Sequence, residues 1–416
     1  MSSEWNTVPL GDVASFKTGK LDSNAAEQGG KYPFFTCSPN TLAINSFAFD
    51  AEAVILAGNN ANGVFSCKHY SGKFNAYQRT YVIEPLSKSI ASCRYLFFVI
   101  SHQVNHLKEL SVGSATKFLT KTILNNLPVA LPRLEEQERI AELLGALDDR
   151  ITLLRETNAT LEAIAQALFK SWFVDFDPVR AKQEGRAPEG MSDATAALFP
   201  DGFEESELGL VPKGWRVGSL ADLAALNSES WTAKKHPDTV AYIDLANAKD
   251  NQIAEVTIYA FDEAPSRARR VLRGGDTIVG TVRPGNRSFA FIHQAASNLT
   301  ASTGFAVLRP REIENTEFVY LAATQDSSIE HLTHVADGGA YPAVRPEVVA
   351  GIKCVLPSGA IMQAFHDVTA PLLASVAANQ QQAQTLATLR DTLLPRLISG
   401  QLRLPEAEAL IEEATA

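Results

Sequence analysis

Each type of enzymatic reaction needs particular side chains at a particular spacing, so catalytic motifs can be recognised in a sequence. The sequence has no GxxxxGK[ST] phosphate loop, no GxGxxG turn, no HExxH or GxSxG motif, and no NPPY-type loop of base-methylating enzymes. His102 and His106 are four residues apart on a predicted helix and could face one metal ion. No carboxylate motif accompanies them, so we interpret them as surface histidines. The sequence predicts no catalytic residue and no metal site.

Arginine side chains suited to nucleic acid cluster in the second half of the sequence. Arg283 and Arg287 flank a Pro-Gly-Asn turn at the end of a predicted strand, and the loop at 338–345 carries Tyr341 and Arg345 before a predicted helix. A guanidinium group can bind a phosphate or read a guanine edge with two hydrogen bonds. The other candidates of this half form one basic cluster, Arg267, Arg269, Arg270 and Arg273.

Amide and basic side chains of the first half form a second candidate set. The loop at 58–63 supplies asparagine amides suited to adenine edges, and the loop at 113–117 precedes the first long helix. The set is Asn59, Asn60, Asn62, Lys68, Lys73, Arg79, Thr116 and Lys117. For any single residue of the two sets, a solvated surface position is the better interpretation. As sets on two related units, they favour DNA binding.

The composition restricts the function classes. The formal net charge of −10 argues at first against nucleic acid, but residues 131–212 carry 8 basic and 17 acidic side chains, whereas residues 5–130 carry 11 and 7. DNA is therefore not excluded. The cysteines are scattered without a CxxC pair, so we expect neither disulfides nor a zinc site. Apolar runs are too short to cross a bilayer and the N-terminus has no signal pattern, so we expect a cytoplasmic protein without membrane contact.

The elements that must position these residues occur twice. Tyr95-Leu96 recurs 225 residues later as Tyr320-Leu321, and Leu131-Pro132 recurs as Leu356-Pro357. The loops that begin at Gly113 and Gly338 have the same offset, while the segment at 4–14 is echoed 210 residues later. The frame of the unit therefore repeats while its interior diverges. Two copies at a fixed offset predict two related units.

Short β-rich runs separated by Gly and Asn loops predict that both units are mixed α/β. In the first unit these runs lie at 32–36, 53–56, 64–66 and 77–83, and a helix is expected at about 92–110. In the second unit the runs lie at 240–245, 276–282, 288–292 and 304–308.

Each unit is followed by a long helix with an apolar column whose steps alternate between four and three residues, which is the pattern of a coiled coil. The first column is Ile140, Leu144, Leu147, Ile151, Leu154, Asn158, Leu161, Ala165, Leu168 and Trp172. The second column is Phe365, Thr369, Leu372, Val376, Asn379, Ala383, Leu386, Arg390, Leu393 and Leu397. Because Thr369, Asn379 and Arg390 interrupt the second column, we expect it to pair less tightly.

An antiparallel register that sets Ile140 beside Leu397 and Trp172 beside Phe365 also sets Asn158 opposite Asn379. A buried asparagine pair lowers stability but disfavours slipped registers. The alternative is that each asparagine contacts water at a loosely packed position. The residues expected to pair the helices are Leu144, Leu147, Ile151, Leu154, Asn158, Leu161, Leu372, Val376, Asn379, Leu386 and Leu393.

Several segments resemble the specificity subunits of type I restriction-modification systems. They are LPRLEEQERIAELLGALDDRI at 131–151, LFKSWFVDFDPVRAK at 168–182, LGLVPKGW at 208–215 and LRDTLLPRLISGQLRL at 389–404, beside the two-copy layout of the chain. The fold class that this resemblance implies is α+β. Two pseudo-repeated α/β target-recognition domains are expected, separated by two long helices that form an antiparallel coiled coil.

With this resemblance the chain divides into six expected segments. They are a first target-recognition domain at 1–131, a long helix at 132–176, a linker at 177–213, a second target-recognition domain at 214–357, a second long helix at 358–398, and a tail at 399–416 that we expect to be frayed.

The resemblance implies a non-catalytic subunit that reads a bipartite site in double-stranded DNA, one half-site per recognition domain. The partners it implies are two adenine-N6 methyltransferase subunits and endonuclease/translocase subunits. It implies no cofactor for this chain, with S-adenosylmethionine, ATP and Mg on the partner subunits. The alternative is an orphan or degenerate scaffold that assembles partners without reading sequence. An enzyme with its own methylase or nuclease centre is a weaker third hypothesis.

Overall fold

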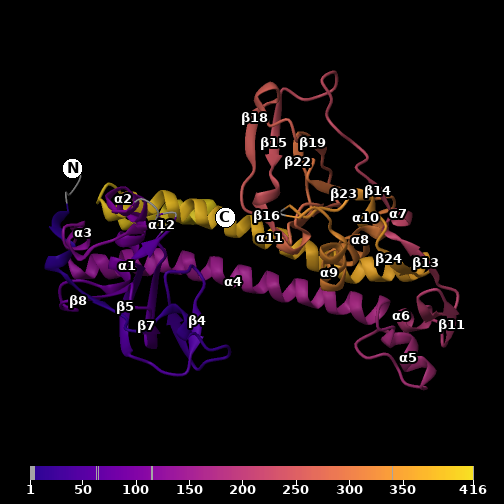
Figure 1. Ribbon diagram of the computed structural model, residues 1–416, viewed down its shortest axis with the longest axis horizontal. Coiled ribbons are helices and arrows are strands. Elements are labelled where there is room, and N and C mark those ends of the chain that lie inside the picture. Colours follow the sequence, from indigo (N-terminus) through magenta and orange to yellow (C-terminus); the bar gives the residue numbers. More distant parts are fainter. Residues whose placement is uncertain (1–4, 62, 64, 114–115, 340, 416) are drawn as a thin grey trace. The chain divides into compact units, whose positions relative to one another are not determined.

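The computed structural model describes residues 5–61, 63, 65–113, 116–339 and 341–415. The chain divides into two compact units, of which unit 1 comprises Met1–Leu154 and Gln382–Ala416 and unit 2 comprises Arg155–Gln381. Figure 1 follows the elements of each unit along the chain. Within the described residues, none of the helices combines the length and the apolar character needed to span a membrane.

Unit 1 is built on a six-stranded sheet with the order β2-β8-β5-β7-β3-β4. Its strands are β1 (Asn6–Pro9), β2 (Ala14–Thr18), β3 (Tyr32–Phe35), β4 (Leu42–Ile44), β5 (Phe49–Ala57), β6 (Asn59–Asn60), β7 (Cys67–Ala76), β8 (Thr80–Pro85), β9 (Lys117–Phe118) and β10 (Pro128–Leu131). Its helices are α1 (Cys93–His102), α2 (Val104–Leu110), α3 (Lys121–Asn125), the first half of α4 (Leu134–Phe173), the last part of α11 (Gly359–Ile398) and α12 (Leu404–Thr415).

Helix α1 covers one face of this sheet, because its apolar side lies in the main core with Val54 of β5 and Ile83 of β8. The Ser92 hydroxyl caps the helix by accepting from the Tyr95 N–H. The buried Tyr95 ring donates its hydroxyl to the Ala130 carbonyl at 2.7 Å, which ties α1 to β10. A smaller aromatic cluster that includes Phe74 covers the opposite face.

Unit 2 contains two four-stranded sheets, with the orders β14-β23-β20-β21 and β18-β15-β22-β19. Its strands are β11 (Phe203–Ser206), β12 (Gly209–Pro212), β13 (Arg216–Ser219), β14 (Ala224–Leu226), β15 (Thr239–Ile243), β16 (Ala248–Lys249), β17 (Gln252–Ile253), β18 (Thr257–Ala260), β19 (Ala268–Val271), β20 (Asp276–Gly280), β21 (Phe289–Ile292), β22 (Leu299–Ser302), β23 (Phe305–Pro310) and β24 (Lys353–Leu356). Its helices are α5 (Asp177–Gln183), α6 (Asp193–Leu198), α7 (Leu220–Leu223), α8 (Thr316–Thr324), α9 (Asp326–Val335) and α10 (Pro346–Ala350), with the remaining parts of α4 and α11.

The two units repeat the same strand pairings at the offsets predicted from the sequence. In unit 1, β1 pairs with β10 so that Asn6 faces Leu131, and in unit 2, β13 pairs with β24 so that Arg216 faces Leu356. In the same way β2 pairs with β8, and β14 pairs with β23. The order β2-β8-β5-β7 of unit 1 therefore corresponds to β14-β23-β20-β21 of unit 2. The sheet β18-β15-β22-β19 is the part of unit 2 that diverges.

Within unit 2, α4 and α11 pack in the antiparallel register that the sequence predicts. The Asn379 Nδ2 group donates to the Asn158 Oδ1 atom at 2.9 Å, and the Asn158 Nδ2 group donates to the Val376 carbonyl at 3.0 Å. At the other end of this segment, the Trp172 and Phe365 ring centroids are 5.4 Å apart. Both amide groups are therefore hydrogen-bonded within the helix pair.

Beyond the asparagine pair, each column has one position at which the neighbouring residue is buried instead, while Ala165, Trp172, Thr369 and Phe365 are buried as predicted. Leu168 and Leu372 of the predicted columns are only partly buried, whereas their neighbours Phe169 and Leu373 are buried. A straight α-helix has 3.6 residues per turn and drifts from a 3.5-residue repeat. The aromatic cluster around Phe169 stabilises its buried position.

Changing both seam asparagines to leucine should reveal an energetic coupling between them. We expect the free energies of unfolding of Asn158→Leu, Asn379→Leu and the double variant to be non-additive by about 0.5–3 kcal/mol, because either single change leaves the other amide without its partner. Urea denaturation of the three variants measures this coupling. As a control, Asn158→Leu should add without coupling to Asn298→Leu, since Asn298 hydrogen-bonds Thr239 instead. If the effects of Asn158→Leu and Asn379→Leu add to within about 0.5 kcal/mol, the predicted coupling between the two asparagines is wrong.

In unit 1 the same two helices pack through the main core. The residues expected to pair the helices here are buried in it, namely Leu144, Leu147, Ile151, Leu154, Leu386 and Leu393. Arg390, which interrupts the second column, lies at its edge and pairs with Asp148 at 2.5 Å. A Cβ atom at Gly145 would lie 2.3 Å from the Arg94 guanidinium, so the glycine leaves room for this side chain, which pairs with Asp149.

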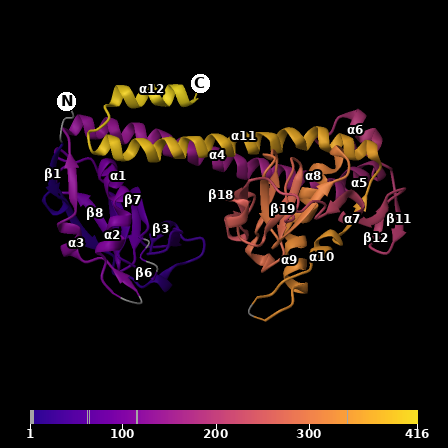
Figure 2. The ribbon, with the colours of Figure 1, turned by 90° about the horizontal axis from the view of Figure 1, so that it is seen from above.

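Two segments are more ordered than the sequence indicates. The expected linker forms α5, α6 and the β11-β12 hairpin, and its Val179, Phe199 and Val211 side chains are buried in the core of unit 2. The prediction of a frayed C-terminal tail is wrong, because residues of the tail form helix α12, and Leu404 and Ala407 of this helix lie in the core of unit 1. Figure 2 shows α12 alongside the first part of α4. Apolar side chains spaced at helical intervals bury both segments, and composition alone does not reveal this.

Candidate nucleic-acid interface

The predicted loops of unit 1 meet in a short antiparallel ladder at the end of β5. Strand β6 pairs with β9, so that Asn59 faces Phe118 and Asn60 faces Lys117. The Leu119 N–H donates to the Gly58 carbonyl at 2.9 Å and extends the ladder. The structure thus brings the asparagine loop and the loop before α4 together.

Unit 2 contains the same ladder at the end of β20. The Val344 N–H donates to the Thr281 carbonyl at 2.9 Å, and Val282 pairs with Ala343. The Arg283 N–H donates to the Pro342 carbonyl at 2.7 Å, which places Arg283 where unit 1 has Asn60. We call residues 58–60 with 117–119 in unit 1, and residues 281–283 with 342–344 in unit 2, the loop platform of each unit.

At each loop platform an arginine stacks on an aromatic ring, and one member of each pair belongs to the platform, Phe118 in unit 1 and Arg283 in unit 2. In unit 1 the exposed Arg79 guanidinium lies 5.5 Å from the Phe118 ring centroid, and in unit 2 the exposed Arg283 guanidinium lies 4.7 Å from the Tyr341 ring centroid. The Tyr341 side chain is 71% exposed. Stacking holds a guanidinium plane in one orientation while its N–H groups remain able to donate. Such a pair can contact phosphate or a base edge.

The backbone at the turn of unit 2 adopts left-handed conformations at two residues that are not glycine. Arg283 has φ 47° and Arg287 has φ 59°, and they flank the short 3₁₀ turn Pro284–Asn286. Conformations of this kind cost of order 1–3 kcal/mol each and occur preferentially at functional sites. The surrounding contacts therefore hold the Arg283 position against a local preference.

The other predicted residues of unit 1 lie in different environments. Lys68 donates to the Thr41 hydroxyl at 3.0 Å, and burial lowers the pKa of its ammonium group. Lys73 faces Asp50 at the opposite end of β5 from the loop platform, with its ammonium 4.7 Å from the Phe47 ring centroid. Thr116 directly precedes β9 and is partly buried, and Asn62 lies outside the described residues.

The basic cluster of unit 2 is largely engaged with the protein itself. Arg267 pairs with Asp244 at 3.1 Å and Arg273 pairs with Glu229 at 2.9 Å. Arg269 stacks on the Phe261 ring, and Arg270 donates to the Ser230 hydroxyl. These contacts reduce the positive charge that the cluster offers to DNA. The exposed Arg345 lies one residue beyond the loop platform, at the start of α10.

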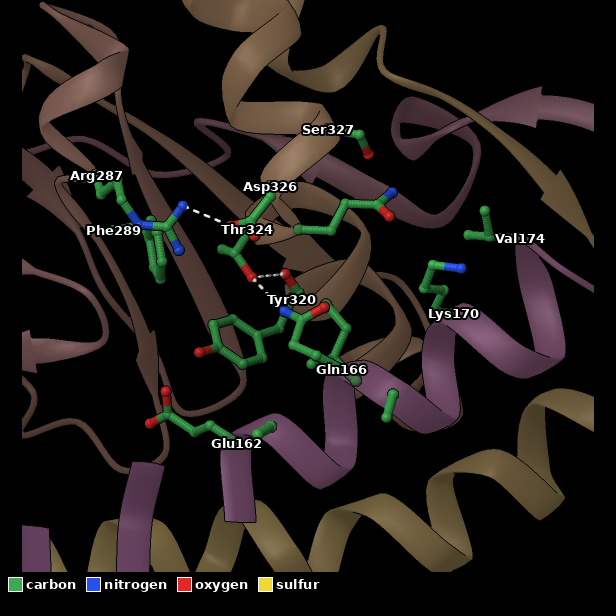
Figure 3. A pocket seen from close by; sticks show the side chains of 14 residues that line it. Glu162, Gln166, Lys170, Val174, Arg287, Phe289, Tyr320, Thr324, Asp326 and Ser327 are labelled. Carbon is green, nitrogen blue, oxygen red and sulfur yellow. Dashed lines mark hydrogen bonds and ion pairs between the residues drawn. The ribbon is translucent and has the colours of Figure 1, made fainter. Parts of the chain in front are cut away.

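Arg287 faces a cleft rather than the loop platform. It pairs with Asp250 at 2.5 Å and with Asp326 at 2.7 Å, and these two carboxylates raise the pKa of its guanidinium despite partial burial. The cleft encloses about 480 Å³ between α4, α8, the start of α9 and the start of β21. Figure 3 shows Glu162 and Tyr320 in the same cleft. Burial raises the pKa of the Glu162 carboxyl, which accepts a hydrogen bond from Asn251.

Two features of the structure were not predicted from the sequence. Phe118 was not selected although it carries the stacked Arg79, and its position directly after Lys117 was the available signal. The second feature is a cluster of Glu52, His69 and Cys93, which is distant in sequence and where no metal site was expected. Its residues have no spacing that a motif search could detect.

Three comparisons with known proteins bear on the family. Residues 2–163 match the family model of the type I restriction modification DNA specificity domain. The chain is 37% identical over 246 residues to the EcoDI specificity subunit of Escherichia coli, covering 57% of this chain and 52% of that protein. It is 25% identical over 370 residues to the HindI specificity subunit of Haemophilus influenzae, covering 77% and 80%.

The fold has a match among solved structures. The S subunit of a type I restriction-modification system from M. genitalium superposes with a TM-score of 0.61 at 13% identity, covering 96% of this chain and 97% of that one. At this identity the likeness is one of fold, and it confirms the α+β class with long paired helices.

Residues 2–163 thus resemble the DNA specificity domain of type I restriction-modification systems. The chain as a whole resembles the specificity subunits of these systems, which are not their catalytic components. The aligned region spans about half of the E. coli relative, 52% of its length.

Proposed function

We propose that this chain is the DNA-reading specificity subunit of a type I restriction-modification complex and that each unit reads one half of a bipartite target. The observation that carries the proposal is the loop platform, which occurs once in each unit at the end of corresponding strands, β5 and β20. Each copy contributes one member of an arginine–aromatic pair, Phe118 beneath Arg79 in unit 1 and Arg283 over Tyr341 in unit 2. Phosphate contacts from such groups would orient the duplex, and base-edge contacts would provide the sequence reading.

The difference between the two loop platforms supports reading of two different half-sites. Where unit 2 places Arg283, unit 1 places Asn60. Arginine favours the two acceptors of a guanine edge, whereas asparagine favours the donor and acceptor of an adenine edge. Mismatch energies of roughly 1–3 kcal/mol at well-separated positions add, so two modest readers together give high specificity.

The proposed partners are two adenine-N6 methyltransferase subunits and the endonuclease/translocase subunits, with double-stranded DNA as the shared substrate. The named relatives are subunits of type I restriction enzymes, which supports this assembly. In this proposal S-adenosylmethionine, ATP and Mg bind to the partners, which carry out methyl transfer and cleavage. A role on chromosomal DNA would place the complex in the cytoplasm.

Co-expression with the methyltransferase subunit tests the proposal directly. We expect N6-methyladenine, mapped across an unmodified genome by modification-sensitive sequencing, to fall in one bipartite motif with a constant gap. Replacing residues 1–131 with the corresponding unit of another specificity subunit should then change one half of the motif only. A change in both halves would contradict the modular assignment. A stable complex that methylates no motif would favour the alternative, a scaffold that assembles partners without reading sequence.

A further inference from the structure

Three side chains with different metal-binding groups converge in unit 1. A carboxylate oxygen of Glu52, an imidazole nitrogen of His69 and the Cys93 sulfur all lie within 4.8 Å of one another. The His69 Nε2 and Glu52 Oε1 atoms are 3.0 Å apart. The three residues come from β5, β7 and the first turn of α1.

The sheet register explains why the groups meet. In the β5-β7 ladder Val54 faces His69 and Glu52 faces Ser71. Side chains two residues apart along a strand point to the same face, so Glu52 and His69 are diagonal neighbours beneath α1. Cys93 is the first residue of α1, directly after the Ser92 cap, and its side chain is 5% exposed. The Phe97 ring, one turn further along α1, lies 6.1 Å from the His69 ring.

We propose that Glu52, His69 and Cys93 form a site for a divalent transition-metal ion, with zinc as the fitting ion and water in the fourth position. Zinc takes thiolate, imidazole and carboxylate ligands at about 2.0–2.3 Å in a tetrahedral arrangement. Ligand atoms around such an ion are separated by roughly 3.3–3.8 Å, so the cluster needs only small side-chain movements. The Glu52 and His69 side chains are 33% and 24% exposed, which gives water and the ion access.

The carboxylate charges of Glu52 and Glu84 act on the Cys93 sulfur and attract a divalent ion to it. Binding forms the sulfur–metal bond and releases the thiol proton to solvent, so the affinity falls as the pH is lowered.

The second unit shows that the fold does not require these polar groups. Thr277 pairs with Phe291 as Val54 pairs with His69, so Phe291 occupies the position of His69. By the same registers Gly275 corresponds to Glu52. Phe318, 225 residues after Cys93, is fully buried in α8. The corresponding site of unit 2 is therefore apolar, and the polar trio of unit 1 is a local addition to a common framework.

Titration of the metal-free full chain with Co²⁺ tests the site, because a cobalt–thiolate bond gives a near-ultraviolet charge-transfer band. We expect one Co²⁺ per chain, displacement of the band by Zn²⁺, and a higher thermal midpoint with zinc. His69→Gln and Glu52→Gln should each weaken Co²⁺ binding by more than about 100-fold, since loss of an outer partner alone costs 10- to 100-fold.

Cys93→Ser should abolish the charge-transfer band, and Cys354→Ser is the matched control. Burial raises the pKa of the Cys354 thiol to about 12, as it does for Cys93, but Cys354 belongs to unit 2 and the cluster belongs to unit 1. Cys93→Ser could disturb the core. If circular dichroism shows that this variant is unfolded, His69→Gln and Glu52→Gln, which keep the thiol, provide the test. Absence of the band in the unaltered chain, or a band that survives in His69→Gln and Glu52→Gln, would overturn the proposal.

Discussion

Replacing Arg283 with alanine should weaken binding of the assembled complex to its target duplex by roughly 5- to 150-fold, corresponding to about 1–3 kcal/mol. Arg283 is exposed, is held by the hydrogen bond from its N–H to Pro342, and stacks on Tyr341. The variant removes the guanidinium but keeps the loop platform. The measurement is fluorescence anisotropy at one fixed salt concentration, on a duplex that carries the mapped motif.

The pattern of the loss distinguishes two roles for Arg283. If the guanidinium reads a base, the variant relaxes one position of one half-site and leaves the other half unchanged. If it binds a phosphate, affinity falls uniformly across sequences and the slope of log affinity against log salt decreases by about one contact.

Arg311 provides the matched control for this experiment. It is an exposed arginine of the same unit that follows β23, outside the loop platform. Arg311→Ala should bind within about 2-fold of the unaltered complex, since a single exposed charge away from the duplex acts only through the screened field. Equal losses in the two variants would refute a specific role for the loop platform.

Replacing Arg309 with methionine should destabilise unit 2 by about 3–5 kcal/mol, because it leaves a buried carboxylate without its counter-ion. The Asp276 side chain is fully buried, and both of its oxygens accept hydrogen bonds from Arg309 at 2.9 Å. Asp276 also accepts from the Arg273 N–H at 2.7 Å. The hydrogen bonds to Asp276 are the largest cause that raises the pKa of the Arg309 guanidinium.

Urea denaturation followed by tryptophan fluorescence measures this effect, because Trp172, Trp215 and Trp231 all lie in unit 2. The double variant Arg309→Met with Asp276→Leu should recover part of the loss, since it removes both charges together. The control is Arg267→Met, which breaks the ion pair with Asp244. Because the Arg267 side chain is 60% exposed, this change should lower the free energy of unfolding by no more than about 1 kcal/mol. A loss for Arg309→Met no larger than that of Arg267→Met would show that Asp276 is solvated in solution.

The sequence did not predict some strands, for a physical reason. Strand β7 has ten residues, CKHYSGKFNA, yet its polar side chains and central glycine lack a clear alternation. It is held by its place between β5 and β3 rather than by its own propensity. The run at 64–66, by contrast, was expected to be a strand, and its described residues 65 and 66 are not in one.

What the sequence by itself determined is the part of the fold that depends on periodicity and repetition. The alternating spacing of the apolar columns predicts α4 and α11, and matching the lone asparagines predicts the register in which Asn379 donates to Asn158. The 210- and 225-residue offsets predict the shared pairings, such as Asn6 with Leu131 and Arg216 with Leu356. Each of these features depends on the spacing within one stretch of sequence or on the likeness between two stretches, and both can be recognised without the structure.

Only the tertiary structure decided what each candidate side chain contacts. Carboxylates from distant segments pair with Arg267, Arg273 and Arg287, and the Arg283 guanidinium stacks on Tyr341. The convergence of Glu52, His69 and Cys93 likewise depends on how β5, β7 and α1 pack. Ion pairs and ligand clusters form between residues far apart in the chain, and their distances are set by packing rather than by any spacing along the sequence.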